Sequence, residues 1–195
     1  MCNAYRCKEE DLADHTGGRR LLLDRKDLGR LVRRTDRAPV LRGDGMMATM
    51  RWGWERNKLG TINNSREDKL RGPMWGAAFK ERRCVIPVTG FYEFTGQAGH
   101  KQAHLFTRPD DNWFWIAGLW EESEKHGLCF SMVTTEPNAL VATIHDRMPA
   151  YLEEGEVARY LAGEIGTFTP LASSIRVEDA TNPLLKSKPI QGELF

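Results

Sequence analysis

A chain of 195 residues, 41% hydrophobic and 28% charged, has the composition of a single soluble globular domain with its own core. No apolar run reaches transmembrane length, and early acidic residues argue against a signal peptide. The four cysteines form no C-x-x-C pair, so we expect neither a zinc site nor a disulfide framework, and a reducing cytoplasm as the location.

The net charge of +1 conceals a basic stretch. Residues 17–42 hold nine Lys or Arg against three Asp. Such a cluster favours a polyanionic partner, and a solvated helix face explains it equally well.

Hydrophobic spacing and turn residues predict the elements in chain order. We expect a helix at 24–37, a strand at 46–54, a loop at 58–73, a helix at 74–82, strands at 84–87 and 91–94, a loop at 96–101, strands at 113–119 and 128–134, and helices at 137–144 and 153–162. Many short strands with interspersed helices predict an α+β fold. We expect one domain, residues 1–195, on an antiparallel sheet or barrel with short helices around it.

The start of the chain, Met1-Cys2-Asn3, carries the most specific chemistry. If Met1 is removed, Cys2 presents an α-amine and a thiol on adjacent carbons, which together trap an aldehyde as a five-membered thiazolidine ring. The amine suits this task because an α-amino pKa of about 8 leaves a useful neutral fraction at pH 7. A frayed terminus is the alternative interpretation.

Three internal segments are further candidates. Glu93 lies among aromatics in Gly90-Phe91-Tyr92-Glu93-Phe94, where it either lines a pocket or faces solvent from an edge strand. His145 lies in a His-Asp-Arg run closed by Pro149, where it either transfers protons or caps a helix.

The third segment runs through Asn63-Asn64-Ser65-Arg66. Its amides and guanidinium suit a sugar or a phosphate, and a simple turn is the alternative. Aromatic residues such as Trp52 could stack unpaired bases, although most aromatics belong to cores.

Together these segments resemble the SOS-response-associated peptidase (SRAP) family, sensors of abasic sites in single-stranded DNA. The resemblance rests on Met-Cys at the start, Arg51-Trp52-Gly53, Asn64-x-Arg66, Gly90-Phe91-Tyr92-Glu93 and Ile144-His145-Asp146-Arg147-Met148-Pro149, in that order. It extends from Cys2 to about Asn182.

The resemblance implies roles for these residues. Cys2 would form the crosslink once the protein has removed its own Met1, and Asn64 would help to hold the opened sugar. Glu93 would lie beside the α-amine, and His145 would act as acid or base. Arg66 would contact a DNA phosphate.

The chain also departs from the family pattern. Asn3 and Ala4 stand where the family commonly has Gly-Arg, so a DNA-contacting arginine is missing, and Arg6 is the candidate to replace it. Asn63 beside Asn64 leaves the register of the Asn motif open. These departures bear on DNA affinity more than on the chemistry.

The sequence therefore predicts a monomeric protein that crosslinks to abasic single-stranded DNA through Cys2, with a possible lyase side reaction by β-elimination. It would contact DNA through Arg66, Trp52 and Arg6 and need no metal or organic cofactor and no membrane. In the cytoplasm it would associate with the nucleoid when bound to DNA. The alternatives are an N-terminal-nucleophile cysteine amidohydrolase and a non-catalytic nucleic-acid-binding module.

Overall fold

Strands are the main secondary structure of the chain that the computed structural model describes, which is residues 2–7, 21–22, 31–97, 100–110, 113–168 and 175–185. Several basic residues of the 17–42 stretch lie outside these ranges, so the structure does not place that stretch as a whole.

Five strands close on themselves to form a barrel. They are β4 (Arg37–Arg42), β5 (Met47–Trp52), β9 (Arg83–Val88), β12 (Phe114–Ser123) and β13 (Gly127–Thr135). Antiparallel pairing runs in the order β13-β12-β9-β4-β5. A short parallel pairing of β13 with β5 then completes the ring. This closure pairs β13 and β5, the two end strands of the order, so their facing edges are not left open.

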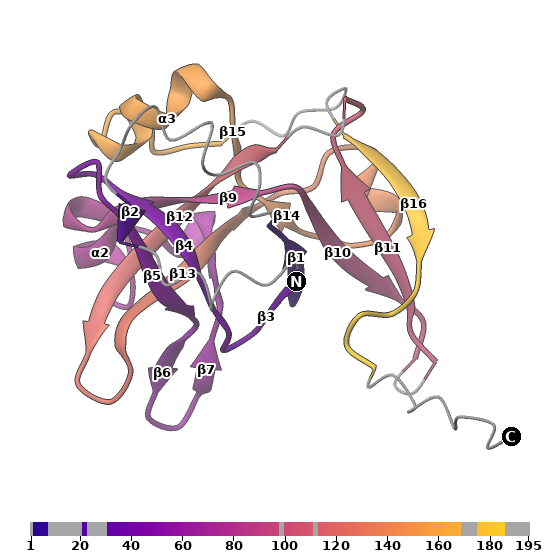
Figure 1. Ribbon diagram of the computed structural model, residues 1–195, viewed down its shortest axis with the longest axis horizontal. Coiled ribbons are helices and arrows are strands. Elements are labelled where there is room, and N and C mark those ends of the chain that lie inside the picture. The colour runs from indigo at the N-terminus through magenta and orange to yellow at the C-terminus, as the bar shows by residue number, and fades with distance from the viewer. Residues whose placement is uncertain are drawn as a thin grey trace, which may run out of the picture.

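A second sheet lies beside the barrel, in the order β16-β11-β10-β1-β3 (Figure 1). Its strands are β1 (Ala4–Arg6), β3 (Leu31–Arg33), β10 (Gly90–Thr95), β11 (Gln102–Thr107) and β16 (Arg176–Ala180). Only Thr89 separates β9 from β10, so the chain passes directly from the barrel into this sheet. In this sheet β1 pairs with β10, so the first residues of the chain lie beside the strand that carries Glu93.

The remaining elements connect or cover these strands. They are β2 (Leu21–Leu22), β6 (Trp54–Arg56), β7 (Gly60–Ile62), β8 (Asn64–Arg66), η2 (Glu67–Lys69), α2 (Gly76–Glu81), η3 (Val141–Thr143), β14 (Met148–Pro149), β15 (Tyr151–Leu152) and α3 (Glu154–Leu161). The parallel partner of β13 changes from β5 to β8 farther along the strand. The β6–β7 hairpin therefore projects between two segments that share β13 (Figure 1).

Aromatic side chains join the barrel to the second sheet. The Tyr5 ring meets the Trp52 ring edge-on at 5.0 Å between centroids. Phe91 contacts Phe114 of the barrel at 6.4 Å. Large buried rings of this kind supply much of the apolar area that stabilises a fold. Because Tyr5 belongs to β1, this packing anchors the start of the chain firmly.

Close approach of β10 and β11 explains the glycine at the start of β10. A Cβ at Gly90 would lie 2.9 Å from the carbonyl oxygen of Phe106 and 3.0 Å from a Leu105 methyl. No larger residue fits there without moving the strands, so Gly90 fixes the position of the strand that carries Glu93.

The α+β barrel with few short helices is confirmed. The helix predicted at 74–82 is α2, that at 153–162 is α3, and the strands predicted at 46–54, 84–87, 91–94, 113–119 and 128–134 are present. Among the described residues no helix is long and apolar enough to span a membrane.

Three predicted elements are wrong in whole or part. The described part of the predicted helix at 24–37 is not helical, because Leu31–Arg33 pairs with β1 as a strand and β4 begins at Arg37. The loop at 58–73 contains β7, β8 and η2. The helix at 137–144 shrinks to one 3-10 turn, η3, and the side chain of Asn138, which precedes it, accepts a hydrogen bond from the Val141 amide at 2.9 Å.

Candidate active site

The buried start of the chain is the centre of the candidate site. Cys2 is 0% exposed, and its thiol donates to the Ala4 carbonyl oxygen at 3.2 Å. The Cys2 carbonyl oxygen accepts two amide hydrogen bonds, from Asn63 Nδ2 at 3.0 Å and from Asn64 Nδ2 at 2.9 Å. Two hydrogen bonds to one carbonyl oxygen thus fix the backbone of Cys2, which an unconstrained terminus would not show.

Asn63 and Asn64 are themselves held by the barrel. The Asn63 carbonyl oxygen accepts from the Trp52 indole at 2.8 Å and from the Met132 amide at 3.0 Å. Both asparagine side chains therefore contact Cys2. The buried Oδ1 of Asn64 has no partner within the described part of the chain, which leaves an acceptor available to a bound molecule.

Glu93 lies on the inner side of β10 and is 1% exposed, so the solvent-facing alternative is wrong. Burial raises the pKa of its carboxyl group to about 7, against an ordinary value of 4.5, and the charge of the amino terminus opposes that rise. A carboxyl group with this pKa exchanges a proton readily at neutral pH, which suits an acid or base.

His145 follows η3 and approaches Glu93, with 3.9 Å between His145 Nε2 and Glu93 Oε2. Its Nδ1 lies 3.0 Å from the Arg147 amide nitrogen and 2.8 Å from Asp146 Oδ1. A neutral ring either accepts from the amide there or, in its Nδ1–H tautomer, donates to Asp146, and a protonated ring also donates to Asp146. Partial burial lowers the His145 pKa, and the amino terminus acts in the same direction, so the ring is mostly neutral at pH 7.

The Cys2 thiol is held in its protonated form. Burial raises its pKa far above the ordinary value, and the nearby negative charge of Glu93 adds to the effect. A protonated thiol is a poor nucleophile until its surroundings change. The site therefore favours chemistry that does not begin with a free thiolate.

Arg147 is the residue of this region that sequence reasoning did not single out. It is 8% exposed, and its Nη2 donates to the Thr134 carbonyl oxygen at 2.6 Å. Its buried Nε has no partner among the described residues. Arg147 lines a cavity of about 440 Å³ together with Arg66, which is half exposed. The sequence feature that could have identified Arg147 is its position directly after His145-Asp146.

The other two residues expected to contact DNA differ in position. Arg6 is exposed, and its Nε donates to the Tyr92 hydroxyl at 2.7 Å, with the guanidinium 5.4 Å from that ring's centroid. Trp52 is 0% exposed and packs against Tyr5 and Phe130. Trp52 has no free face for a base to stack on, so we correct its assignment to a core residue that positions Asn63.

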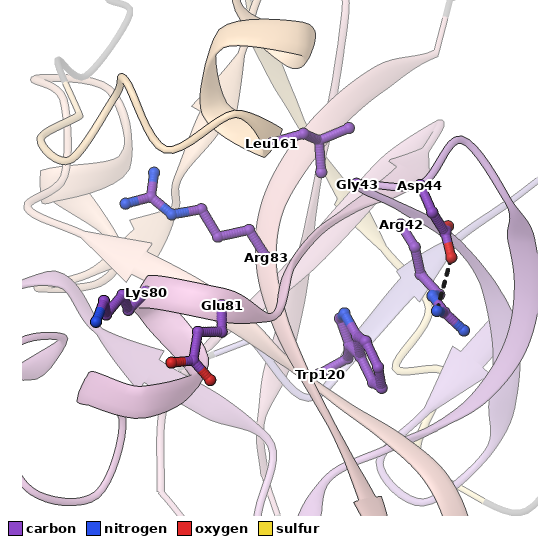
Figure 2. A pocket seen from close by; sticks show the side chains of 8 residues that line it. All are labelled: Arg42, Gly43, Asp44, Lys80, Glu81, Arg83, Trp120 and Leu161. Carbon is purple, nitrogen blue, oxygen red and sulfur yellow. Dashed lines mark ion pairs between the residues drawn. The ribbon is translucent and has the colours of Figure 1, made fainter.

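A second cavity, of about 300 Å³, lies apart from these residues (Figure 2). Figure 2 shows Arg42 paired with Asp44, while the Arg83 guanidinium points away from them. The Arg42–Asp44 distance is 2.7 Å, and the Arg42 guanidinium lies 4.5 Å from the centroid of the Trp120 ring. Neither Cys2, Glu93 nor His145 lines this cavity. Within the described ranges no three His, Cys, Asp or Glu side chains gather closely enough to hold a metal ion.

Fold and site together define a strand-barrel protein whose buried second residue is held by two asparagines and lies near the buried carboxyl group of Glu93. The sequence profile of the family described as SOS response associated peptidase (SRAP) matches residues 6–192. The chain therefore belongs to the SRAP family.

Relatives and solved structures agree with this assignment. The chain is 30% identical over 127 residues to the abasic site processing protein YoqW of Bacillus subtilis, a match that covers 59% of this chain and 57% of YoqW. It is 29% identical over 171 residues to the abasic site processing protein HMCES of Xenopus tropicalis, covering 70% of this chain and 51% of HMCES. The chain thus spans little more than half the length of these relatives.

Two crystal structures share the fold. One is a protein from Bacteroides thetaiotaomicron, with a TM-score of 0.76 at 19% identity, covering 93% of each chain. The other is a protein from Bordetella bronchiseptica, with a TM-score of 0.76 at 18% identity, covering 93% of this chain and all of that one.

Proposed function

We propose that this protein, acting as a monomer, captures abasic sites in single-stranded DNA through a covalent bond to Cys2, after removal of Met1. One observation carries the proposal: the Cys2 backbone is clamped by Asn63 and Asn64 beside the Glu93–His145 pair. The relatives are named abasic site processing proteins, which supports the same substrate.

The proposed reaction balances without a cofactor. The neutral amine of Cys2 attacks C1′ of the open-chain deoxyribose aldehyde, and loss of one water gives an imine. The thiol sulfur then bonds to C1′ while the thiol proton passes to the nitrogen, which closes a thiazolidine. Ring closure is intramolecular and avoids the entropy loss of a second encounter.

Opening of the cyclic sugar requires two proton transfers. The C1′ hydroxyl gives up a proton, the bond between C1′ and the ring oxygen breaks, and that oxygen gains a proton. Because the pKa of Glu93 is raised to about 7 and that of His145 is lowered, Glu93 is the better donor and neutral His145 the better acceptor. The resemblance leaves His145 as acid or base, and the proposal gives it the role of base in this step.

The high pKa of the Cys2 thiol supports reaction through the amine first. An N-terminal-nucleophile amidohydrolase would instead need the thiolate as its attacking group. Self-directed removal of Met1 and strand cleavage by β-elimination belong to the same proposal, since both would use proton transfer at Glu93 and His145.

DNA contacts are proposed for three arginines. Arg66 and Arg147 line the cavity next to the Asn64 and His145 segments, and Arg6 is exposed on β1, the strand that follows Cys2. Guanidinium groups bind phosphate oxygens by charge-assisted hydrogen bonds. Association should weaken as salt rises, because binding releases counterions from the DNA.

Incubation with abasic single-stranded DNA tests the proposal. Wild type should form an adduct that survives heat and SDS without borohydride, and Cys2→Ala should not. Cys7→Ala is the matched control, because Cys7 is also a buried thiol near the start of the chain but cannot supply an α-amine. Normal adduct yield from Cys2→Ala, or turnover of an amide in place of aldehyde capture, would reject the proposal.

A further inference from the structure

Asp68, in the 3-10 helix η2, lies between Arg66 and Arg147, two of the three arginines that line the 440 Å³ cavity. Arg66 binds it in a bidentate manner, with Nε 2.9 Å from Oδ1 and Nη2 3.1 Å from Oδ2. The buried Arg147 lies farther away, with Nη2 4.0 Å from Oδ1. One carboxylate therefore faces two guanidinium groups and satisfies only one of them closely.

The cavity lining is balanced in formal charge. Three arginines, including Arg71, are matched by Glu67, Asp68 and Glu136. Glu67 is committed elsewhere, because its two oxygens accept from the Phe168 amide and the Thr135 hydroxyl. Glu136 is exposed at the rim. Among the lining carboxylates, Asp68 is thus the one that contacts both Arg66 and Arg147.

Arg147 is held as if for an anion. Its side chain is 10% exposed, its Nη2 is anchored by the Thr134 carbonyl oxygen, and its buried Nε has no partner in the described residues. A buried guanidinium is stable only when its charge and donors are satisfied. The weak 4.0 Å contact with Asp68 leaves that requirement partly unmet in the free protein.

We propose that Asp68 is a resident counter-ion that occupies the place of a nucleic-acid phosphate, and that a phosphate group of the bound strand displaces it. The inference rests on the proposed function and adds a residue that sets DNA affinity. Phosphate oxygens reach both arginines at once, which the short Asp68 side chain does not. Each capture then includes an exchange of one anion for another.

Breaking the Arg66–Asp68 pair costs little free energy, because both side chains are exposed to solvent. The Arg66 and Asp68 side chains are 52% and 46% exposed, and such surface pairs contribute little to stability. Lys69, 4.0 Å from Asp68 Oδ2, can retain the carboxylate after it leaves Arg66. Displacement therefore needs only a side-chain movement and no unfolding of η2.

The chain contains a matched control. Arg108 and Asp110 have the same spacing in sequence and the same bidentate geometry, at 3.0 and 3.2 Å, yet line neither of the two cavities. Asp68→Asn and Asp110→Asn remove the same charge from the protein. A difference between them reports the position of Asp68 and not the change in net charge.

The test measures equilibrium binding of a labelled, unmodified single-stranded oligonucleotide by fluorescence anisotropy. Asp68→Asn should bind about three- to tenfold more tightly than wild type, and Asp110→Asn should stay within about twofold. In an Arg66→Ala background the gain from Asp68→Asn should shrink, because the freed partner is absent. Asp68→Ala, checked for an unchanged melting curve, guards against an effect peculiar to asparagine.

Equal gains for Asp68→Asn and Asp110→Asn, or unchanged or weaker binding by Asp68→Asn and Asp68→Ala, would overturn the inference. Crosslinking of abasic DNA by the wild type is measured in parallel. A wild type that crosslinks while Asp68→Asn binds no more tightly rejects the role of Asp68 alone. A wild type that does not crosslink rejects the proposed function itself.

Discussion

Glu93 should destabilise the fold whenever it is ionised, and Glu93→Gln removes that effect. The gap between the ordinary pKa of 4.5 and the folded pKa of about 7 corresponds to roughly 3 kcal/mol of unfolding free energy. A raised folded pKa favours the protonated carboxyl. Its stabilising contribution is complete below about pH 4.5 and is lost as pH rises through about 7.

Unfolding by urea, followed at pH 5, 6, 7 and 8 for wild type and Glu93→Gln, measures this dependence. The stability of the variant relative to wild type should rise across that range by up to ~3 kcal/mol, which corresponds to about 6–12 °C in melting temperature. The change with pH is the informative quantity, because the amide of Gln adds a constant difference of its own. Glu178→Gln, on an exposed position of β16, is the control.

A difference between wild type and Glu93→Gln that does not change with pH would refute the reasoning. It would mean that the carboxyl group is solvated or paired well enough to ionise normally. The expected gain in stability should coincide with a loss of crosslinking, because functional sites often retain groups that destabilise the fold.

Three further outcomes follow from the site. In kinetic assays of adduct formation, Asn63→Ala and Asn64→Ala should each slow crosslinking, because both amides hold the Cys2 carbonyl group. The double variant should be slower than either single variant. Trp52→Phe should destabilise the fold by about 1–3 kcal/mol in urea unfolding, because the smaller ring fills less of the buried site and the Asn63 carbonyl oxygen keeps only the Met132 amide of its two donors. Crosslinking to abasic DNA should slow as pH rises above about 7, where Glu93 loses its proton. A pre-opened small aldehyde should not show this slowing, and equal slowing for both substrates would contradict the donor role of Glu93.

Part of the fold was predictable because its elements carry local signals. The alternation in β13 and the amphipathic pattern of α3 depend on residues near one another in sequence. The Leu31–Val32 segment shows the limit: its spacing suits a helix, but pairing with Ala4–Arg6 makes it a strand. The parallel closure of the barrel through β5 and β13 joins segments about eighty residues apart and has no local signal.

The candidate site divides in the same way. Cys2, Glu93 and His145 stand out because their residue types carry chemistry within compact motifs. Their convergence, and the double clamp by Asn63 and Asn64, depends on β1, β8 and β10 meeting in space. By sequence alone, Glu93 could face either a pocket or the solvent. Its burial in the structure decides between these two interpretations.

Aromatic and charged partners were the hardest to place. Trp52 has the character of a base-stacking residue, yet the structure encloses it completely. Asp68 looks like an ordinary surface carboxylate in the sequence, and only its contacts with Arg66 and Arg147 give it a specific position.

Intact-protein mass spectrometry of the adduct with an abasic single-stranded oligonucleotide tests the central claim most directly. The account predicts the mass of protein lacking Met1 plus that of the oligonucleotide, minus one water, with peptide sequencing placing the link on Cys2. An iodoacetamide step under denaturing conditions separates the products, because the sulfur of a thiazolidine resists alkylation whereas an open imine leaves the thiol free. An adduct that retains Met1, lies on another residue or keeps an alkylatable Cys2 thiol would contradict the account.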